Sequence, residues 1–137
     1  GEFQLADAFA LMVARGAHLH AFPVQNWFDC GVTESLLETN RHLLGRLGPA
    51  RPREGVILIP PVYLADSAEV SNSVLGPNVS VGEKARISDS VIKDSIIGMG
   101  AQVAGCYLHQ SLIGDHAVVE AGARQLNVGD SSEVRLQ

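Results

Sequence analysis

Four histidines of this sequence could do acid–base or metal chemistry. His109 and His116 lie in the second half of the chain, and a histidine in a groove between subunits can act as a general base toward an amine or a hydroxyl. Both occupy polar, outward-facing positions, so a solvated surface histidine is the favoured interpretation. His18 and His20 alternate with apolar residues and therefore lie on one face of a predicted strand. No carboxylate or cysteine lies at ligand spacing from this pair, so a surface strand face is favoured over a metal site.

The two cysteines of the chain, Cys30 and Cys106, give no reactive site. They form neither a disulfide framework nor a metal cluster, which is typical of a protein in a reducing cytoplasm. Cys106 occupies the same position in an internal repeat as Ser73 and Ser90. We therefore interpret it as a small packed side chain and not as a nucleophile.

That internal repeat has a period of 16 or 17 residues and determines which side chains can meet. Its units span 64–80, 81–96, 97–112 and 113–128, after a partial unit at 58–63. Self-similarity at a fixed period, with one small structural unit per repeat, indicates a solenoid. Five columns of residues stay apolar and should point inward: Leu64/Val81/Ile97/Ile113, Ala68/Ala85/Ala101/Ala117, Val70/Ile87/Val103/Val119, Leu58/Leu75/Ile92/Leu108 and Val62/Val79/Ile96/Leu112.

The spacing inside each unit predicts a mainly β fold. Aliphatic residues separated by four and then by one or two positions suit three short flat strands with bends between them. Gly76, Gly82, Gly98 and Gly114 each follow an aliphatic residue, where a large side chain would strain a tight position. Residues 57–125 are therefore predicted to form a parallel β-helix of the hexapeptide type with about four coils. Its left-handed winding is what the similarity to hexapeptide-repeat proteins implies.

Residues 1–47 share nothing with the repeat. Apolar residues at helical spacing predict a helix over 5–13, which Gly16 ends. Alternation over 17–23 predicts a strand, and Thr33 is the expected N-cap of a second helix. The inner face of that second helix should carry Leu36, Leu37, Asn40, Leu43, Leu44 and Leu47.

So short a segment cannot enclose a core of its own. It would dock on the β-helix, exchange between chains, or form the end of a larger domain. Residues 48–56, rich in glycine and proline, are the expected linker, and 126–137 the expected tail. Arg46, Arg51 and Arg53 cluster at the linker and could meet phosphate, although a solvated linker is the simpler interpretation.

The N-terminal residues resemble the last part of the catalytic domain of sugar-1-phosphate nucleotidylyltransferases. In that family a Gly-Glu-aromatic-Gln-Leu-Thr-Asp-Ala helix start precedes a strand, a Trp-x-Asp-x-Gly motif and a helix beginning near Ser-Leu-Leu-Glu-Ala-Asn. Ala6, Cys30 and Thr39 depart from the usual Thr, Thr and Ala. The ending 126–134 also looks like that of bacterial long-form members, which carry a β-helix after the catalytic domain. The matching residues are Gly1, Glu2, Phe3, Gln4, Leu5, Asp7, Ala8, Trp27, Asp29, Gly31, Ser35, Leu36, Leu37, Glu38 and Asn40.

This resemblance implies the function of a longer enzyme. Residues 1–47 would be the helix-strand-helix remnant of an α/β nucleotidyltransferase domain. Such enzymes join a nucleoside triphosphate to a sugar 1-phosphate and release pyrophosphate, with Mg²⁺ offsetting phosphoryl charge. The aspartate of Trp-x-Asp-x-Gly is one of two that hold Mg²⁺ in the family, which is Asp29 in this sequence. The other interpretation of Asp29 is a turn residue or a helix-start acid.

The parts of the family that bind nucleotide and sugar have no counterpart in this chain. The glycine-rich loop, the second aspartate and the sugar-binding segment are all missing. We therefore expect no catalytic residue and no cofactor in this fragment alone, and we expect it to be inactive by itself. The β-helix would serve oligomerisation, as a trimer or a dimer, or regulation.

Charge and hydropathy exclude several classes of partner. The net charge is −5 and the only lysines are Lys84 and Lys93, so no basic face for nucleic acid or anionic membrane is expected. No run of 18 apolar residues occurs, so membrane spanning is not expected. A cytoplasmic location is predicted. The alternative function is a hexapeptide-repeat acyltransferase-like protein, with His109 or His116 as base, or a purely oligomerising β-helix.

Overall fold

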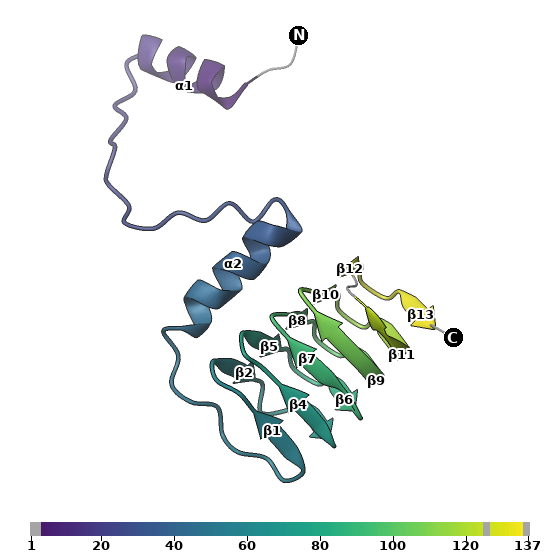
Figure 1. Ribbon diagram of the computed structural model, residues 1–137. Helices are drawn as coiled ribbons and strands as arrows, with labels where there is room; N and C mark the ends of the chain where they lie inside the picture. The colour runs from purple at the N-terminus through teal and green to yellow at the C-terminus, as the bar shows by residue number, and fades with distance from the viewer. Residues whose placement is uncertain (1–3, 125–126, 136–137) are drawn as a thin grey trace.

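The computed structural model describes residues 4–124 and 127–135 (Figure 1). Within these ranges, two helices come first, α1 (Leu5–Ala14) and α2 (Thr33–Leu44), and short strands follow. No helix of this described part is long and apolar enough to cross a membrane. The strands are β1 (Val56–Leu58), β2 (Val62–Leu64), β3 (Glu69–Ser71), β4 (Ser73–Leu75), β5 (Val79–Val81), β6 (Arg86–Ser88), β7 (Val91–Lys93), β8 (Ile96–Ile97), β9 (Gln102–His109), β10 (Leu112–Ile113), β11 (Val118–Arg124), β12 (Asn127–Val128) and β13 (Glu133–Arg135).

The strands stack in parallel along three sides of a solenoid (Figure 1). One side has the order β2-β5-β8-β10-β12, a second begins β1-β4-β7, and a third begins β3-β6. The long strands β9 and β11 each turn a corner. In β9, 102–104 pair with β6 on the third side, while 107–109 pair with β7 on the second. The predicted parallel β-helix of about four coils is confirmed.

Four of the five predicted apolar columns are confirmed as inward-facing. Strand pairing puts Leu64, Val81, Ile97 and Ile113 side by side, and Val128 extends this column. The other three columns are also in register or stacked at a bend, and most of their members are at most 2% exposed. Aliphatic side chains from successive coils therefore form one continuous core.

The fifth column is wrong at two of its four residues. Val62 and Val79 are buried. Ile96, however, pairs with Ser80 and is only half-buried, and Leu112, which pairs with Ile96 in the next coil, is half-buried too. The reason is one residue fewer in the bend before β8, which turns Ile96 outward and makes Ser95 the fully buried residue. Ser111 is the buried residue of the next coil.

Glycine is required where adjacent coils approach most closely. A Cβ on Gly98 would lie 2.7 Å from the backbone nitrogen of Asp115, and one on Gly82 would lie 2.8 Å from that of Met99. Real Cβ atoms do not approach backbone so closely. The predicted role of these glycines as tight positions is confirmed, and the contact partner is the backbone of the next coil.

The N-terminal prediction is confirmed for the helices and wrong for the strand. Helix α1 ends as expected, with Gly16 at φ +86°. Helix α2 begins at Thr33, so the prediction of Thr33 as N-cap is wrong by one residue: the extended Val32 is the N-cap, and no side chain caps the helix there. Residues 17–23 form no strand. A single strand cannot pair its backbone without neighbours, and neither helix nor solenoid supplies a sheet edge there.

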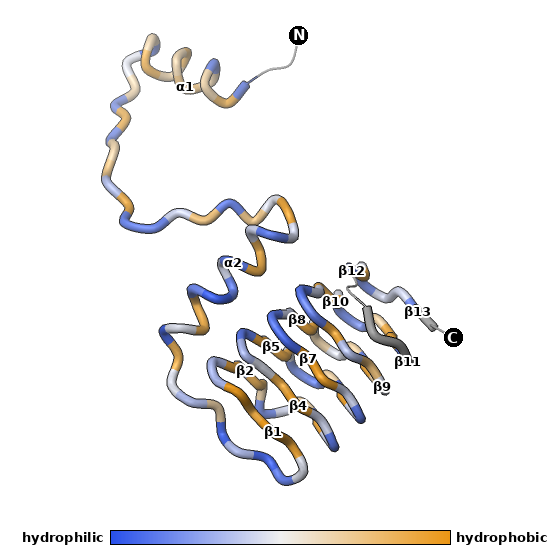
Figure 2. Tube along the Cα trace, in the orientation of Figure 1, coloured by the Kyte–Doolittle hydropathy of each residue, from blue (hydrophilic) through white to orange (hydrophobic). Residues whose placement is uncertain are grey.

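Helix α2 lies against β5 of the solenoid, whereas α1 stands away from it (Figure 1). Leu37 and Leu44 of α2 are buried. Leu43 and Leu47, expected on the inner face, are more than half exposed. Apolar residues recur around α1 (Figure 2), and none of its residues is buried.

Candidate functional site

Asp29 shapes a turn just before α2. Its Oδ1 accepts a hydrogen bond from the backbone N–H of Gly31 at 3.0 Å, which makes an Asx-type turn. A Cβ on Gly31 would lie 3.1 Å from the same oxygen, so glycine leaves room for the carboxylate. Asp29 is exposed to solvent. The turn-residue interpretation thus describes what this carboxylate does in the chain as it stands.

The residues on either side of Asp29 contact α2. The ring of Phe28 lies 4.7 Å from that of His42, with the rings tilted by 48°. The Cys30 thiol lies 3.6 Å from Thr39 Oγ1. Because both neighbours contact the helix, the position of Asp29 depends on the position of α2.

The described residues do not by themselves fit a magnesium site. They contain no group of three or more His, Cys, Asp or Glu side chains that could hold a metal ion. Mg²⁺ requires an octahedral set of oxygen ligands, usually from one or two carboxylates, waters and substrate phosphates. Asp29 offers one carboxylate, and one of its oxygens is engaged with the backbone.

Polar contacts fix α2 on the solenoid through two successive residues. Asn40 Nδ2 donates to the backbone oxygen of Asn78 at 3.3 Å, and Asn40 Oδ1 accepts from the hydroxyl of Ser80. Arg41 donates from Nε to Asp94 Oδ1 at 2.6 Å and from Nη2 to Asp94 Oδ2. This forked pair is geometrically specific because the planar guanidinium matches the carboxylate.

The Arg41–Asp94 pair changes the titration of both groups. The hydrogen bonds from Arg41 hold the pKa of the Asp94 carboxyl below its ordinary 3.8, with a smaller contribution from the nearby charge of His109. The same bonds raise the pKa of Arg41. The Asp94 side chain is 15% exposed and that of Arg41 39%, so the pair is only partly shielded from water. Both groups are charged at neutral pH.

The structure does not bring the histidines into one site. His109 pairs in register with Lys93 and is exposed, and His116 is exposed at a bend with φ +58°. His18 and His20 are exposed in the segment that forms no strand. Among the described residues, no histidine lines the groove of about 650 Å³ on the outer face of β3, β6 and β9.

Cys106 is confirmed as a packed residue of the solenoid. It is 3% exposed, and its backbone N–H donates a hydrogen bond to Ser90 Oγ. The backbone N–H of Ser90 donates in the same way to Ser73 Oγ. Its Sγ lies 3.2 Å from the Ala104 carbonyl oxygen, as a donated hydrogen bond requires. The three residues form a ladder at one corner, one per coil.

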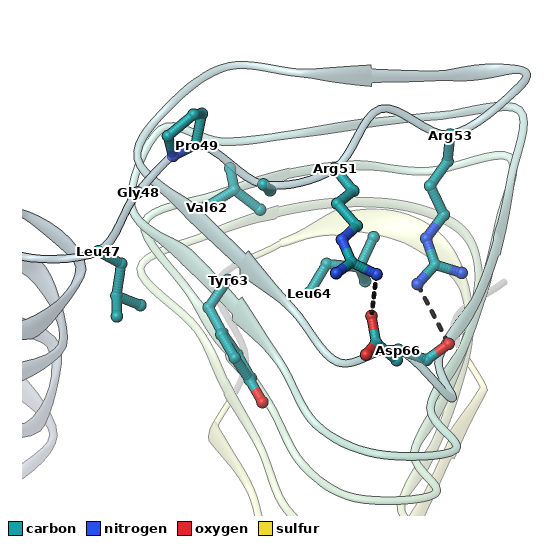
Figure 3. A pocket seen from close by; sticks show the side chains of 10 residues that line it. Leu47, Gly48, Pro49, Arg51, Arg53, Val62, Tyr63, Leu64 and Asp66 are labelled. Atoms are coloured by element: carbon teal, nitrogen blue, oxygen red, sulfur yellow. Dashed lines mark hydrogen bonds and ion pairs between the residues drawn. The ribbon is translucent and has the colours of Figure 1, made fainter.

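Two of the three linker arginines, Arg51 and Arg53, line a cavity of about 310 Å³ at the first coil, together with Tyr63 and Leu64 (Figure 3). Arg46 is not among the residues that line it. Arg53 donates to the backbone oxygens of Ala68, Ala65 and Asp66 at 3.0, 3.1 and 3.2 Å. Arg51 lies 3.9 Å from the Asp66 carboxylate and is 88% exposed.

Arg53 therefore has a structural role, and its interpretation as a solvated linker residue is wrong. Between the first two coils, the carbonyl of Ala85 accepts a hydrogen bond from the backbone N–H of Glu69. The equivalent carbonyl one coil earlier, that of Ala68, accepts a hydrogen bond from the guanidinium of Arg53 instead. The sequence alone could not show this, because Arg53 lies outside the repeat.

Two curated relatives align with almost the whole chain. They are the glucose-1-phosphate thymidylyltransferases of Streptomyces griseus and Streptomyces antibioticus, each 27% identical over 164 residues. The alignments cover 99% and 100% of this chain and 46% of each relative, so the chain spans about half the length of the curated relatives it matches. No protein-family model matches the chain. The resemblance to sugar-1-phosphate nucleotidylyltransferases is confirmed by these alignments.

Among solved structures, the chain is similar to a perosamine N-acetyltransferase mutant of Caulobacter crescentus in complex with CoA and GDP-perosamine. That match has 14% identity and a TM-score of 0.38, and covers 61% of this chain and 51% of that one. The acetyltransferase domain of PglB from Neisseria gonorrhoeae, in complex with acetyl coenzyme A, has 17% identity and a TM-score of 0.25 over 60% of this chain and 55% of that one. Likeness at this level carries no argument about function.

Proposed function

We propose that this chain is the C-terminal segment of a cytoplasmic nucleotidyltransferase that makes nucleotide sugars from a nucleoside triphosphate and a sugar 1-phosphate. The observation that carries the proposal is the alignment of nearly the whole chain with two glucose-1-phosphate thymidylyltransferases. Residues 1–47 would complete an α/β catalytic domain, and the β-helix would wind left-handed as in other hexapeptide-repeat proteins. The exposed apolar residues of α1 support this, because that helix lacks a packing partner within the described residues.

In the longer protein, Asp29 would be one of two carboxylates at a magnesium site. Bound Mg²⁺ supplies compensation for phosphoryl charge. The contribution of this chain is positional: the Asx turn orients the Asp29 carboxylate, and the contacts of Phe28 and Cys30 with α2 fix the turn.

The experiment is an assay of pyrophosphate release from deoxythymidine triphosphate and glucose 1-phosphate. We expect activity from the longer protein, in which a nucleotide-binding half precedes this chain, and none from the 137-residue chain. Transfer by the 137-residue chain would contradict the proposal, and so would a longer protein inactive with every nucleoside triphosphate and sugar 1-phosphate.

We also propose that the β-helix assembles subunits into a dimer or a trimer. The outer face of the second side carries an apolar column: Ile57 is 62% exposed and Tyr107 43% exposed, with Val74 and Val91 between them. Covering such a face against a symmetry mate would remove it from water. Sedimentation equilibrium tests this, and a folded monomer at micromolar concentration would contradict it.

A further inference from the structure

We propose that the ion pair between Arg41 and Asp94 positions the Asp29 segment, residues 27–31, on the solenoid. The β-helix would then help to set the geometry of the transfer site in addition to assembling subunits. The consequence for catalysis rests on the proposed function. The positioning does not, and it can be measured in the 137-residue chain.

Two sets of positions on α2 make different contacts. Thr39 and His42 contact Cys30 and Phe28, the neighbours of Asp29. Asn40 and Arg41, which lie between them in the sequence, contact the solenoid. The helix is therefore a short rigid bridge: one part of its surface holds the Asp29 segment and the other is fixed to the coils.

The solenoid presents Asp94 in the first of its two shortened bends, the second being that before Ser111. The bend before β8 is one residue shorter than the bend before β5, where Gly76-Pro77-Asn78 precedes Val79. In the shorter bend, Asp94 has φ +51°, and its N–H donates to the carbonyl of Pro77 at 2.8 Å. From this bend, the Asp94 carboxylate accepts the hydrogen bond from Arg41 of α2.

The Arg41–Asp94 pair is also the strongest polar contact between α2 and the coils. It consists of two charge-assisted hydrogen bonds in a fixed fork, whereas the Asn40 contacts are neutral. Leu37 and Leu44 of α2 are buried, but apolar burial is not directional. The ion pair should therefore decide the angle and register at which α2 sits.

The test uses paramagnetic broadening from a nitroxide attached through Trp27→Cys, at a position of the Asp29 segment that is 77% exposed. The background carries Cys106→Ser and Cys30→Ser, which remove the two native thiols, and the hydroxyl introduced at position 30 can still donate to Thr39 Oγ1. In this background we expect the nitroxide to broaden the amide signals of β5 and its preceding bend. Arg41→Gln and Asp94→Asn should abolish most of that broadening while the chemical shifts of the solenoid core stay unchanged.

The matched control is Glu69→Gln, which breaks the exposed 3.3 Å pair of Glu69 with Arg86 on the third side. It should leave the broadening at its wild-type value. The exchanged pair Arg41→Asp with Asp94→Arg should recover part of the broadening, which loss of helix propensity alone would not allow. Broadening that persists in both Arg41→Gln and Asp94→Asn, or that is lost equally in the control, would overturn the proposal.

In the longer protein, Arg41→Gln should lower kcat by about 10- to 10²-fold through misplacement of the Asp29 carboxylate, with little change in KM for the sugar phosphate. It should also raise the Mg²⁺ concentration needed for half-maximal rate. Unchanged kcat and Mg²⁺ dependence would overturn the catalytic part of the proposal. An inactive wild-type longer protein would refute the proposed function, while the broadening measurement would still decide the positioning.

Discussion

The backbone N–H of Cys106 donates a hydrogen bond to Ser90 Oγ in the preceding coil, 3.1 Å away. The Ser90 hydroxyl in turn donates to the carbonyl of Ser88 at 2.6 Å. Ser90 is only 2% exposed, so water does not replace these bonds when the side chain is removed. One buried hydroxyl thus satisfies two backbone groups at a corner of the solenoid.

Ser90→Ala should destabilise the fold by about 1–3 kcal/mol, the usual cost of leaving a buried polar group without its partner. Chemical denaturation measures this directly. Cys106→Ser is the control and should be close to neutral, because serines already occupy the equivalent positions. Equal stability of Ser90→Ala and wild type would mean that the corner rearranges to bond its amide elsewhere.

Ile87→Asp should unfold the β-helix. Ile87 is 2% exposed in the middle of an inward column, and an unpaired buried carboxylate costs several kcal/mol (roughly 2–7 for a polar group without a hydrogen bond). Circular dichroism and thermal unfolding test this. Ile57→Asp is the matched control at a site 62% exposed, and it should keep the fold. A cooperatively folded Ile87→Asp variant would contradict the assignment of the column to the core.

Arg53→Ala should lower stability by about 1.5–3 kcal/mol, since charged donors make stronger hydrogen bonds than neutral ones. The loss comes from the carbonyls of Ala65, Asp66 and Ala68 at the first coil. Arg51→Ala serves as control. Its pair with Asp66 is long and exposed, so we expect no measurable change in the urea midpoint. A similar loss in both variants would refute the capping role of Arg53.

The Arg41–Asp94 pair should make stability depend on pH at the acid end. The pKa of Asp94 is lowered in the folded state, so the pair contributes fully above the ordinary carboxyl pKa and is lost as pH falls through the lowered value. The difference in unfolding free energy between wild type and Asp94→Asn should thus be largest near neutrality. It should shrink below about pH 4. Urea titrations of both proteins across that range test this, and a constant difference would contradict it.

Asp29→Asn in the longer protein should leave folding intact, because the amide fills the same space and its oxygen can still accept from Gly31. Turnover should fall by about 10²–10³-fold, the typical effect of losing one preorganised electrostatic contact. Pyrophosphate release measured over a range of Mg²⁺ concentrations provides the test. Wild-type turnover in Asp29→Asn would leave Asp29 as a turn residue only.

The sequence predicted the solenoid well because its strand pairs recur at nearly the same offset, 17 residues for Val62 and Val79 and 16 for Val81 and Ile97. Once Val81 and Ile97 share a position in the 16-residue period, parallel stacking makes them neighbours, whatever the rest of the chain does. The prediction failed at Ile96, where the shorter bend shifts the inward position to Ser95. The repeat length shows that a 16-residue unit has one residue fewer than a 17-residue unit. Only the strand pairing shows that the missing residue belongs to the bend before β8.

The contacts around Asp29 could not be predicted in the same way. The motif resemblance singled out Asp29, and helical spacing found α2, yet nothing periodic connects Arg41 with Asp94 or Arg53 with the first coil. Such contacts join segments that share no repeat, so their geometry follows only from how α2 and the linker pack on the finished coils. The sequence by itself determined the coil, its core and the candidate carboxylate. The tertiary structure decided what holds that carboxylate in place.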